Sequence, residues 1–132
     1  MNNLEKQCVT VENGPAAIGP YSVGVVAGGF VFTAGQIGID PVSGTLVAGG
    51  VEAETRQALL NVKAILASAH SSLKNVVKTT VFLKDMGDFT RMNAIYAEFF
   101  DGDFPARSAV QVAALPKNAQ VEIETFAILA KE

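Results

Sequence analysis

The chain has 132 residues, the usual length of one domain. Apolar and aromatic residues make up 49% before its 12 glycines are counted, whereas a typical domain reaches roughly 45–50% with glycine included. Ten basic and 13 acidic residues give a net charge of −3 without any block of like charges, which disfavours binding to nucleic acid. We expect a single domain over residues 1–132, with an apolar surplus that is typical of a subunit interface.

No segment is expected to cross a membrane. The longest apolar run, residues 23–34, is interrupted by three glycines and is too short to span a bilayer. The first twenty residues lack the basic start and apolar stretch of a signal peptide. We therefore predict a cytoplasmic protein.

Single cysteine and histidine residues limit the chemistry. Cys8 has no partner for an intramolecular disulfide, and a spectator role is favoured over a nucleophile. His70 follows an apolar helical stretch, where a helix C-terminal position explains it. One Cys and one His do not supply the three or four ligands of a zinc site, so no metal is expected.

The first half of the chain predicts strands followed by a long helix. Residues 7–11 alternate polar and apolar side chains, and two strands over 21–26 and 30–36 flank a turn at Gly28 and Gly29. A helix over 52–70 is predicted from an apolar face with a 3.6-residue period, formed by Thr55, Leu59, Val62, Leu66 and Ala69. Glu52 and Glu54 fall in its first turn, where carboxylates suit the helix dipole.

The second half predicts a strand over 76–84, a helix from the N-cap Asp88 to about residue 100, and strands over 107–112 and 120–130. The aromatic and sulfur side chains of this second helix are most simply core: Phe89, Met92, Tyr96 and Phe99. The order favours an α+β fold, with a mixed sheet and two helices on one face. The other face then needs a cover, for which a partner subunit is the natural candidate.

Two carboxylates interrupt an apolar strand face. Glu122 and Glu124 share a face with Phe126 and Ile128, because side chains alternate with a period of two. The start of the strand is either simply solvated, or it places a carboxylate in a cleft. Partial burial in a cleft would raise the pKa of the carboxyl and prepare it to accept a proton.

Arg107 and two glycine-containing segments also depart from a plain core. The planar guanidinium of Arg107 matches a carboxylate, although an ordinary salt bridge with Glu122 or Asp103 is the alternative. Glycine in residues 19–22 and in residues 33–36 would let the backbone approach a ligand. Structural turns explain both segments equally well.

Taken together, these segments resemble the Rid family of reactive intermediate deaminases, also called the YjgF family. The matching stretches occur in order along nearly the whole chain: P-A-A-I-G-P-Y-S at 15–22, F-T-A-G-Q-I at 32–37, N-V-K-A-I-L at 61–66, V-V-K-T-T-V-F-L-K-D-M at 76–86, M-N-A-I-Y-A-E-F-F at 92–100, P-A-R-S-A-V at 105–110, L-P-K at 115–117 and V-E-I-E at 121–124. The resemblance implies a chorismate-mutase-like α+β fold and a homotrimer with ligand clefts between subunits.

The resemblance also implies an activity, namely hydrolysis of 2-imino acids such as 2-iminobutanoate and 2-iminopropanoate to 2-oxo acids and ammonia. These imines arise from enamines released by pyridoxal-phosphate enzymes. The implied residues are Arg107, which would bind the substrate carboxylate, Glu122, which would hold and deprotonate water, and the cleft residues Tyr21, Gly35, Asn93 and Ala109. No cofactor is implied.

Ala109 departs from the pattern, since many relatives carry cysteine there, and this excludes a catalytic thiol at that position. Two alternatives without useful catalysis remain, a trimer that senses carboxylate ligands and a chaperone-like binding protein. Ribonuclease or translation-inhibitor activity is disfavoured by the negative net charge and the single histidine.

Overall fold

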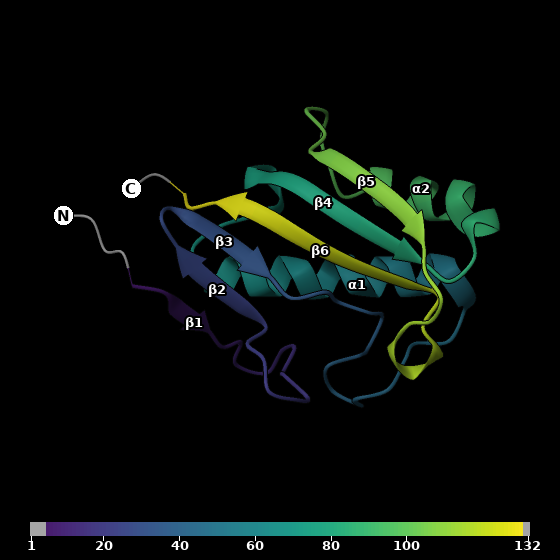
Figure 1. Ribbon diagram of the computed structural model, residues 1–132, viewed down its shortest axis with the longest axis horizontal. Coiled ribbons are helices and arrows are strands. Elements are labelled where there is room, and N and C mark those ends of the chain that lie inside the picture. The colour runs from purple at the N-terminus through teal and green to yellow at the C-terminus, as the bar shows by residue number, and fades with distance from the viewer. Residues whose placement is uncertain (1–4, 131–132) are drawn as a thin grey trace.

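Six strands form one mixed sheet, and two α-helices cover one of its faces, in the computed structural model, which describes residues 5–130 (Figure 1). The elements are β1 (Gln7–Val9), β2 (Gly24–Ala27), β3 (Phe30–Thr33), α1 (Gly50–Ser68), β4 (Val76–Leu83), α2 (Phe89–Ala97), β5 (Ala106–Gln111) and β6 (Val121–Ile128). Short 3₁₀ helices lie at Leu73–Asn75, Met86–Asp88 and Pro116–Asn118.

The strand order across the sheet is β1-β2-β3-β6-β4-β5. Only the neighbours β4 and β5 run parallel, since α2 carries the chain back between them, as a parallel pair requires. The other neighbouring pairs are antiparallel. The predicted α+β class, with a mixed sheet and two helices on one face, is confirmed.

The bounds of several elements differ from those that the sequence predicts. The strand expected over 21–26 begins only at Gly24, because the Tyr21 N–H donates locally to the Gly19 carbonyl at 2.8 Å. The strand expected over 30–36 ends at Thr33, although Gln36 still pairs with Ile123 as an isolated bridge. The helix expected over 52–70 spans Gly50–Ser68 instead. The early end of β3 leaves the residues after Thr33 in a loop.

The core lies between the helices and the sheet. In β6 the odd-numbered residues 121–127 are buried and the even-numbered ones are more exposed. The buried set packs against the apolar stripe of α1 and includes Leu59, Val62, Ile65, Val81 and Ile123. This burial of apolar surface is the main stabilising term of such a fold.

The opposite face of the sheet carries an apolar cluster that no helix within residues 5–130 covers. Phe32 pairs with Phe126, and Phe30 pairs with Ile128, across β3 and β6. These four side chains remain 37–43% exposed, and the Phe32 and Phe126 rings lie 5.2 Å apart. Exposed apolar clusters of this kind are typical of interaction surfaces. No helix within residues 5–130 is long and apolar enough to cross a membrane.

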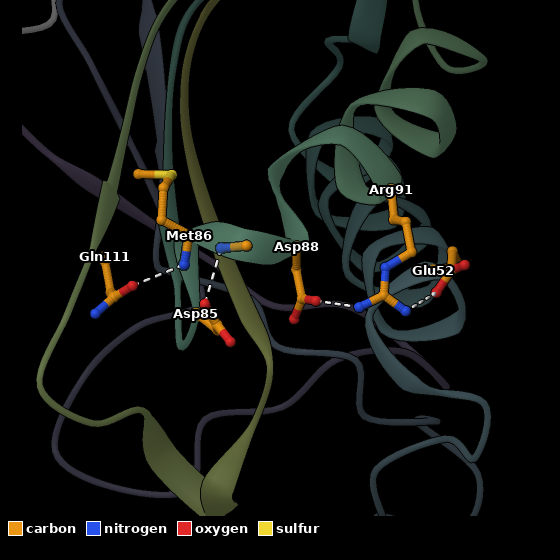
Figure 2. Close-up of polar contacts among 7 residues, drawn as sticks. Glu52, Asp85, Met86, Asp88, Arg91 and Gln111 are labelled. Atoms are coloured by element: carbon orange, nitrogen blue, oxygen red, sulfur yellow. Dashed lines mark hydrogen bonds and ion pairs between the residues drawn. The ribbon is translucent and has the colours of Figure 1, made fainter.

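Polar contacts tie the start of α2 to its neighbours (Figure 2). The Gln111 side chain at the end of β5 accepts the Met86 N–H at 2.7 Å, and Asp85 accepts the Gly87 N–H at 2.8 Å. Asp88 occupies the predicted N-cap position, but its carboxylate caps no backbone N–H. It pairs instead with Arg91, whose guanidinium also lies 3.8 Å from Glu52.

The expectation that Glu54 complements the dipole of the first helix is wrong, since Glu52 alone occupies the first turn. Glu54 is only 6% exposed, and its Oε1 accepts the Gln120 N–H at 2.8 Å, just before β6 begins. A side chain on Gly38 would collide with the Glu54 backbone, because its Cβ would lie 2.7 Å from Cα. Burial raises the pKa of Glu54, which the Gln120 bond and the Lys84 charge offset only in part.

Two substitutions of Glu54 distinguish the effect of its charge on stability from the effect of its hydrogen bond. The folded state holds its pKa above the unfolded value of about 4.3, so its contribution to stability falls as the pH rises between the two values. The Glu54→Gln side chain still accepts the Gln120 N–H but does not ionise. The free energy of unfolding of this variant, relative to that of wild type, should therefore increase as the pH rises between the two pKa values. Glu54→Leu leaves this N–H unpaired and should cost about 1–3 kcal/mol.

Denaturant unfolding of the three proteins from pH 4 to 8, at one protein concentration, measures both effects. A constant difference between Glu54→Gln and wild type, or equal stability of the leucine and glutamine variants, would contradict this account.

Candidate functional site

A cavity of ≈ 430 Å³ opens beside the start of β6. Its walls come from three loops, the 14–21 segment, the 34–44 segment and the 116–117 turn, together with one residue each from α1 and β6. The lining residues are Gly14, Pro15, Ala16, Ile18, Tyr21, Ala34, Gly35, Gln36, Ile37, Ile39, Pro41, Gly44, Asn61, Pro116, Lys117 and Glu122. Three of the residues singled out from the sequence, Tyr21, Gly35 and Glu122, therefore meet in one cavity.

The Glu122 carboxylate lies directly against the backbone of Gly35. A Cβ at position 35 would lie 2.7 Å from Glu122 Oε2 and 2.8 Å from its Cδ, so only glycine leaves room for this placement. The bridge between Gln36 and Ile123, with N···O distances of 2.8 and 3.0 Å, fixes the two segments together. Burial raises the pKa of Glu122, and the negative charge of Glu124 raises it further. The site thus holds a carboxylate with enhanced proton affinity.

Tyr21 presents its hydroxyl group as a donor. Its phenolic oxygen accepts the backbone N–H of Ile18 at 3.3 Å. A hydroxyl that accepts one hydrogen bond still has its O–H to donate. The side chain is half exposed and lines the cavity, so this donor is accessible to a small ligand.

Asn61 is a structural part of the site that the sequence analysis did not single out. Its amide donates to the Ile37 carbonyl at 3.3 Å and the Ile39 carbonyl at 2.9 Å, and its Oδ1 accepts from Gln57 at 2.9 Å. Asn61 is buried on α1 and anchors the loop that carries Gly35. A polar amide inside an otherwise apolar helix face is the sequence signal that could have identified it.

Arg107 lies away from this cavity. It is the register partner of Thr79 in the parallel β4–β5 pair, and Thr79 is fully buried on the helix side of the sheet. Glu122 is instead the register partner of Phe82, on the face without helices. Neither Glu122 nor Asp103, the alternatives from sequence, forms an ion pair with Arg107 in the part of the chain that the structure describes. One chain therefore places the guanidinium and the carboxylate on opposite faces.

Asn93 and Ala109 accompany Arg107 rather than Glu122. Ala109 follows Arg107 by two residues on β5, so both point to the same face. Asn93 lies one helical turn after Phe89, whose ring contacts Arg107. Its buried Oδ1 has no hydrogen-bond partner. Buried polar atoms are normally paired, so this unpaired oxygen distinguishes Asn93 from the other polar groups near Arg107.

The described residues form no metal centre. Across residues 5–130 no three His, Cys, Asp or Glu side chains are grouped so that they could hold a metal ion. The candidate residues form two groups, with Glu122, Tyr21 and Gly35 at the cavity and Arg107, Asn93 and Ala109 near α2 and β5.

Comparison with known proteins agrees with the geometry. Residues 11–129 match the family described as Endoribonuclease L-PSP. The chain is 49% identical over 128 residues to the 2-iminobutanoate/2-iminopropanoate deaminase of Homo sapiens, covering 97% of this chain and 93% of that protein. It is 52% identical over 122 residues to a RutC family protein of Pyrococcus horikoshii, covering 92% and 97% of the two chains.

Solved structures match equally well. The structure of E. coli TdcF with bound serine superposes with a TM-score of 0.89 at 42% identity, and the match covers 94% of this chain and 99% of that one. The expected Rid fold is therefore confirmed.

Removal of the neighbouring charge should lower the pKa of Glu122. We expect Glu124→Gln to shift that pKa toward its usual value without reaching it, because burial is the larger cause. Carbon-13 NMR titration of the Glu122 carboxyl measures the shift. Glu98→Gln is the matched control, since it removes an exposed carboxylate that pairs with Arg56. An unchanged pKa in Glu124→Gln, or an equal shift in both variants, would refute the interaction.

Proposed function

This chain belongs to the Endoribonuclease L-PSP family, which includes the Rid proteins, and from that premise we propose that it hydrolyses 2-imino acids to 2-oxo acids and ammonia. 2-Iminobutanoate and 2-iminopropanoate are the proposed substrates, after the name of the human relative. One observation carries the proposal: the Glu122 carboxylate, whose pKa is raised, borders a cavity. The Arg107 guanidinium, which has no carboxylate partner within residues 5–130, supports it.

In the proposed reaction, Arg107 binds the substrate carboxylate through two parallel hydrogen bonds. Glu122 orients a water molecule and takes one of its protons as the oxygen attacks the imine carbon, a role typically worth about 10²–10⁴-fold in rate. Glu122 passes this proton to the nitrogen, which gives a carbinolamine. It then takes the remaining hydroxyl proton and delivers it to the nitrogen, so that the C–N bond breaks, the carbonyl forms and ammonia leaves. The O–H of Tyr21 supports the imine nitrogen or the developing alcohol, while backbone groups at Gly35 and Ala109 complete the contacts.

The site is proposed to form between two copies of the chain. Because Arg107 and Glu122 lie on opposite faces of one sheet, a cleft that uses both must take them from neighbouring subunits. The exposed cluster of Phe30, Phe32, Phe126 and Ile128 supplies an apolar surface for assembly. We propose a homotrimer, in which each cleft receives Glu122 from one copy and Arg107 and Asn93 from the next.

A binding role without catalysis is the second candidate. The related structure of TdcF holds serine, which is an amino acid with a carboxylate that Arg107 could equally bind. Loss of 2-iminopropanoate, generated in place by an amino-acid oxidase, distinguishes the two roles. A rate equal to that of buffer, from well-folded oligomer, would favour binding alone. The cytoplasmic location stays a prediction.

Mixed oligomers test the shared site directly. Arg107→Ala should lower kcat/KM about 10- to 150-fold, and Glu122→Gln should lower kcat about 10²–10⁴-fold while leaving oxo-acid binding largely intact. In a cyclic trimer, each mixed assembly of the two variants contains one intact cleft. Refolding equal amounts together should therefore restore about one quarter of wild-type activity.

Separately refolded variants, mixed afterwards without subunit exchange, are the control. No recovery after joint refolding would contradict a cleft shared between copies, since a site within one chain cannot be complemented in this way.

A charged side chain introduced on the open face of the sheet tests assembly through that face. Phe126→Glu places a carboxylate in the middle of the exposed apolar cluster, where burial in an interface is costly. We expect light scattering to show a single chain instead of three, with an unchanged circular dichroism spectrum. Val42→Glu, at a turn position that is 94% exposed, should remain trimeric. A trimeric Phe126→Glu protein, or a monomeric wild type, would refute this interface.

A further inference from the structure

We propose that Phe89 and Tyr96 are positioning residues for Arg107, which hold its guanidinium in place and leave its N–H groups free for the substrate carboxylate; this inference rests on the proposed function. The Arg107 Cζ lies 4.8 Å from the centre of the Tyr96 ring and 5.4 Å from that of Phe89. Both distances fall within the range of about 6 Å for cation–π attraction. Two aromatic rings thus contact the cation where the sequence suggested a salt bridge.

The Tyr96 ring is fixed by the core. Tyr96 is almost fully buried, and its hydroxyl lies 2.7 Å from Thr79 Oγ1 in a buried hydrogen bond. Thr79 is the β4 residue paired in register with Arg107. The centres of the Phe100 and Tyr96 rings lie 4.8 Å apart. Movement of Tyr96 away from Arg107 would break a buried hydrogen bond, which is costly.

The Phe89 ring is fixed by the start of its helix. Phe89 is the first residue of α2, directly after the segment whose polar contacts Figure 2 shows. In that segment the Met86 N–H donates to Gln111, which lies on the same strand as Arg107. The helix start and the arginine strand are therefore bound to each other, so the ring and the guanidinium keep their relative position.

Aromatic contacts and a carboxylate contact have different consequences for Arg107. An internal carboxylate would occupy the N–H donors and compete with the substrate. Ring faces attract the cation without accepting those hydrogen bonds. A guanidinium that is already held also loses less conformational freedom when the ligand binds. The rings should therefore increase affinity for a carboxylate, which appears in KM, without changing the bond-breaking steps that determine kcat.

The experiment uses single substitutions that remove one ring each. Phe89→Leu removes the partly buried ring and keeps an apolar side chain, so it is the milder change. Tyr96→Leu removes the buried ring together with its bond to Thr79. Phe99→Leu is the matched control, because Phe99 is a partly buried aromatic residue just after α2 whose ring does not contact Arg107.

Two ligands separate positioning from general packing. Calorimetry measures binding of 2-oxobutanoate and of its neutral amide, which lacks the carboxylate. We expect Phe89→Leu and Tyr96→Leu to weaken acid binding and raise KM about 5- to 30-fold, with amide binding and kcat within about twofold of wild type. Phe99→Leu should change neither. Adding Phe89→Leu to Arg107→Ala should cause no further loss.

A readout without ligand completes the test. Nitrogen-15 relaxation of Arg107 Nε should report an ordered side chain in wild type and Phe99→Leu, and a mobile one in Phe89→Leu. An unchanged Nε signal, or equal loss of acid and amide binding, would overturn the positioning role while leaving the deaminase proposal intact. A wild-type protein that neither binds 2-oxobutanoate nor hydrolyses the imine would overturn the proposed function, and the positioning role with it.

Discussion

The alternation of side chains along β6 is the constraint on which the rest of the structure depends. Residues 121, 123, 125 and 127 point into the core, while residues 122, 124, 126 and 128 lie on the open face. One strand therefore contributes to the packed interior, to the cavity through Glu122 and to the exposed apolar cluster. A shift of register by one residue would exchange all of these roles. Because β6 lies between β3 and β4, hydrogen bonds to both neighbouring strands fix its register.

This constraint divides the candidate site into two halves. Glu122 lies on the open face against Gly35, whereas Arg107 lies on the helix face against α2. Neither half is sufficient for the proposed reaction, in which Arg107 is proposed to bind the substrate and Glu122 to activate water. The same open face that displays Glu122 also displays the apolar cluster, so assembly and completion of the site are proposed to occur together.

Buried polar contacts hold the loops of the site in position. Glu54 binds the backbone just before β6, and Asn61 binds two carbonyls of the loop that follows Gly35. The Thr79–Tyr96 bond does the same for the ring beside Arg107. Each such group would be costly if left unpaired, so these contacts specify one arrangement of segments that apolar packing alone would leave loosely defined.

The sequence by itself predicted the order of the elements and the α+β class, both of which the structure confirms, and it supplied the candidate residues of each half of the proposed site. Apolar periodicity predicted α1 and the two faces of β6, because such patterns depend on residues within one element. Only the tertiary structure decided that Arg107 and Glu122 face opposite ways, that Glu54 is buried and that Phe89 and Tyr96 contact a cation. These facts depend on the pairing and packing of segments far apart in the chain, such as β5 with α2, and no local pattern of residues encodes that pairing.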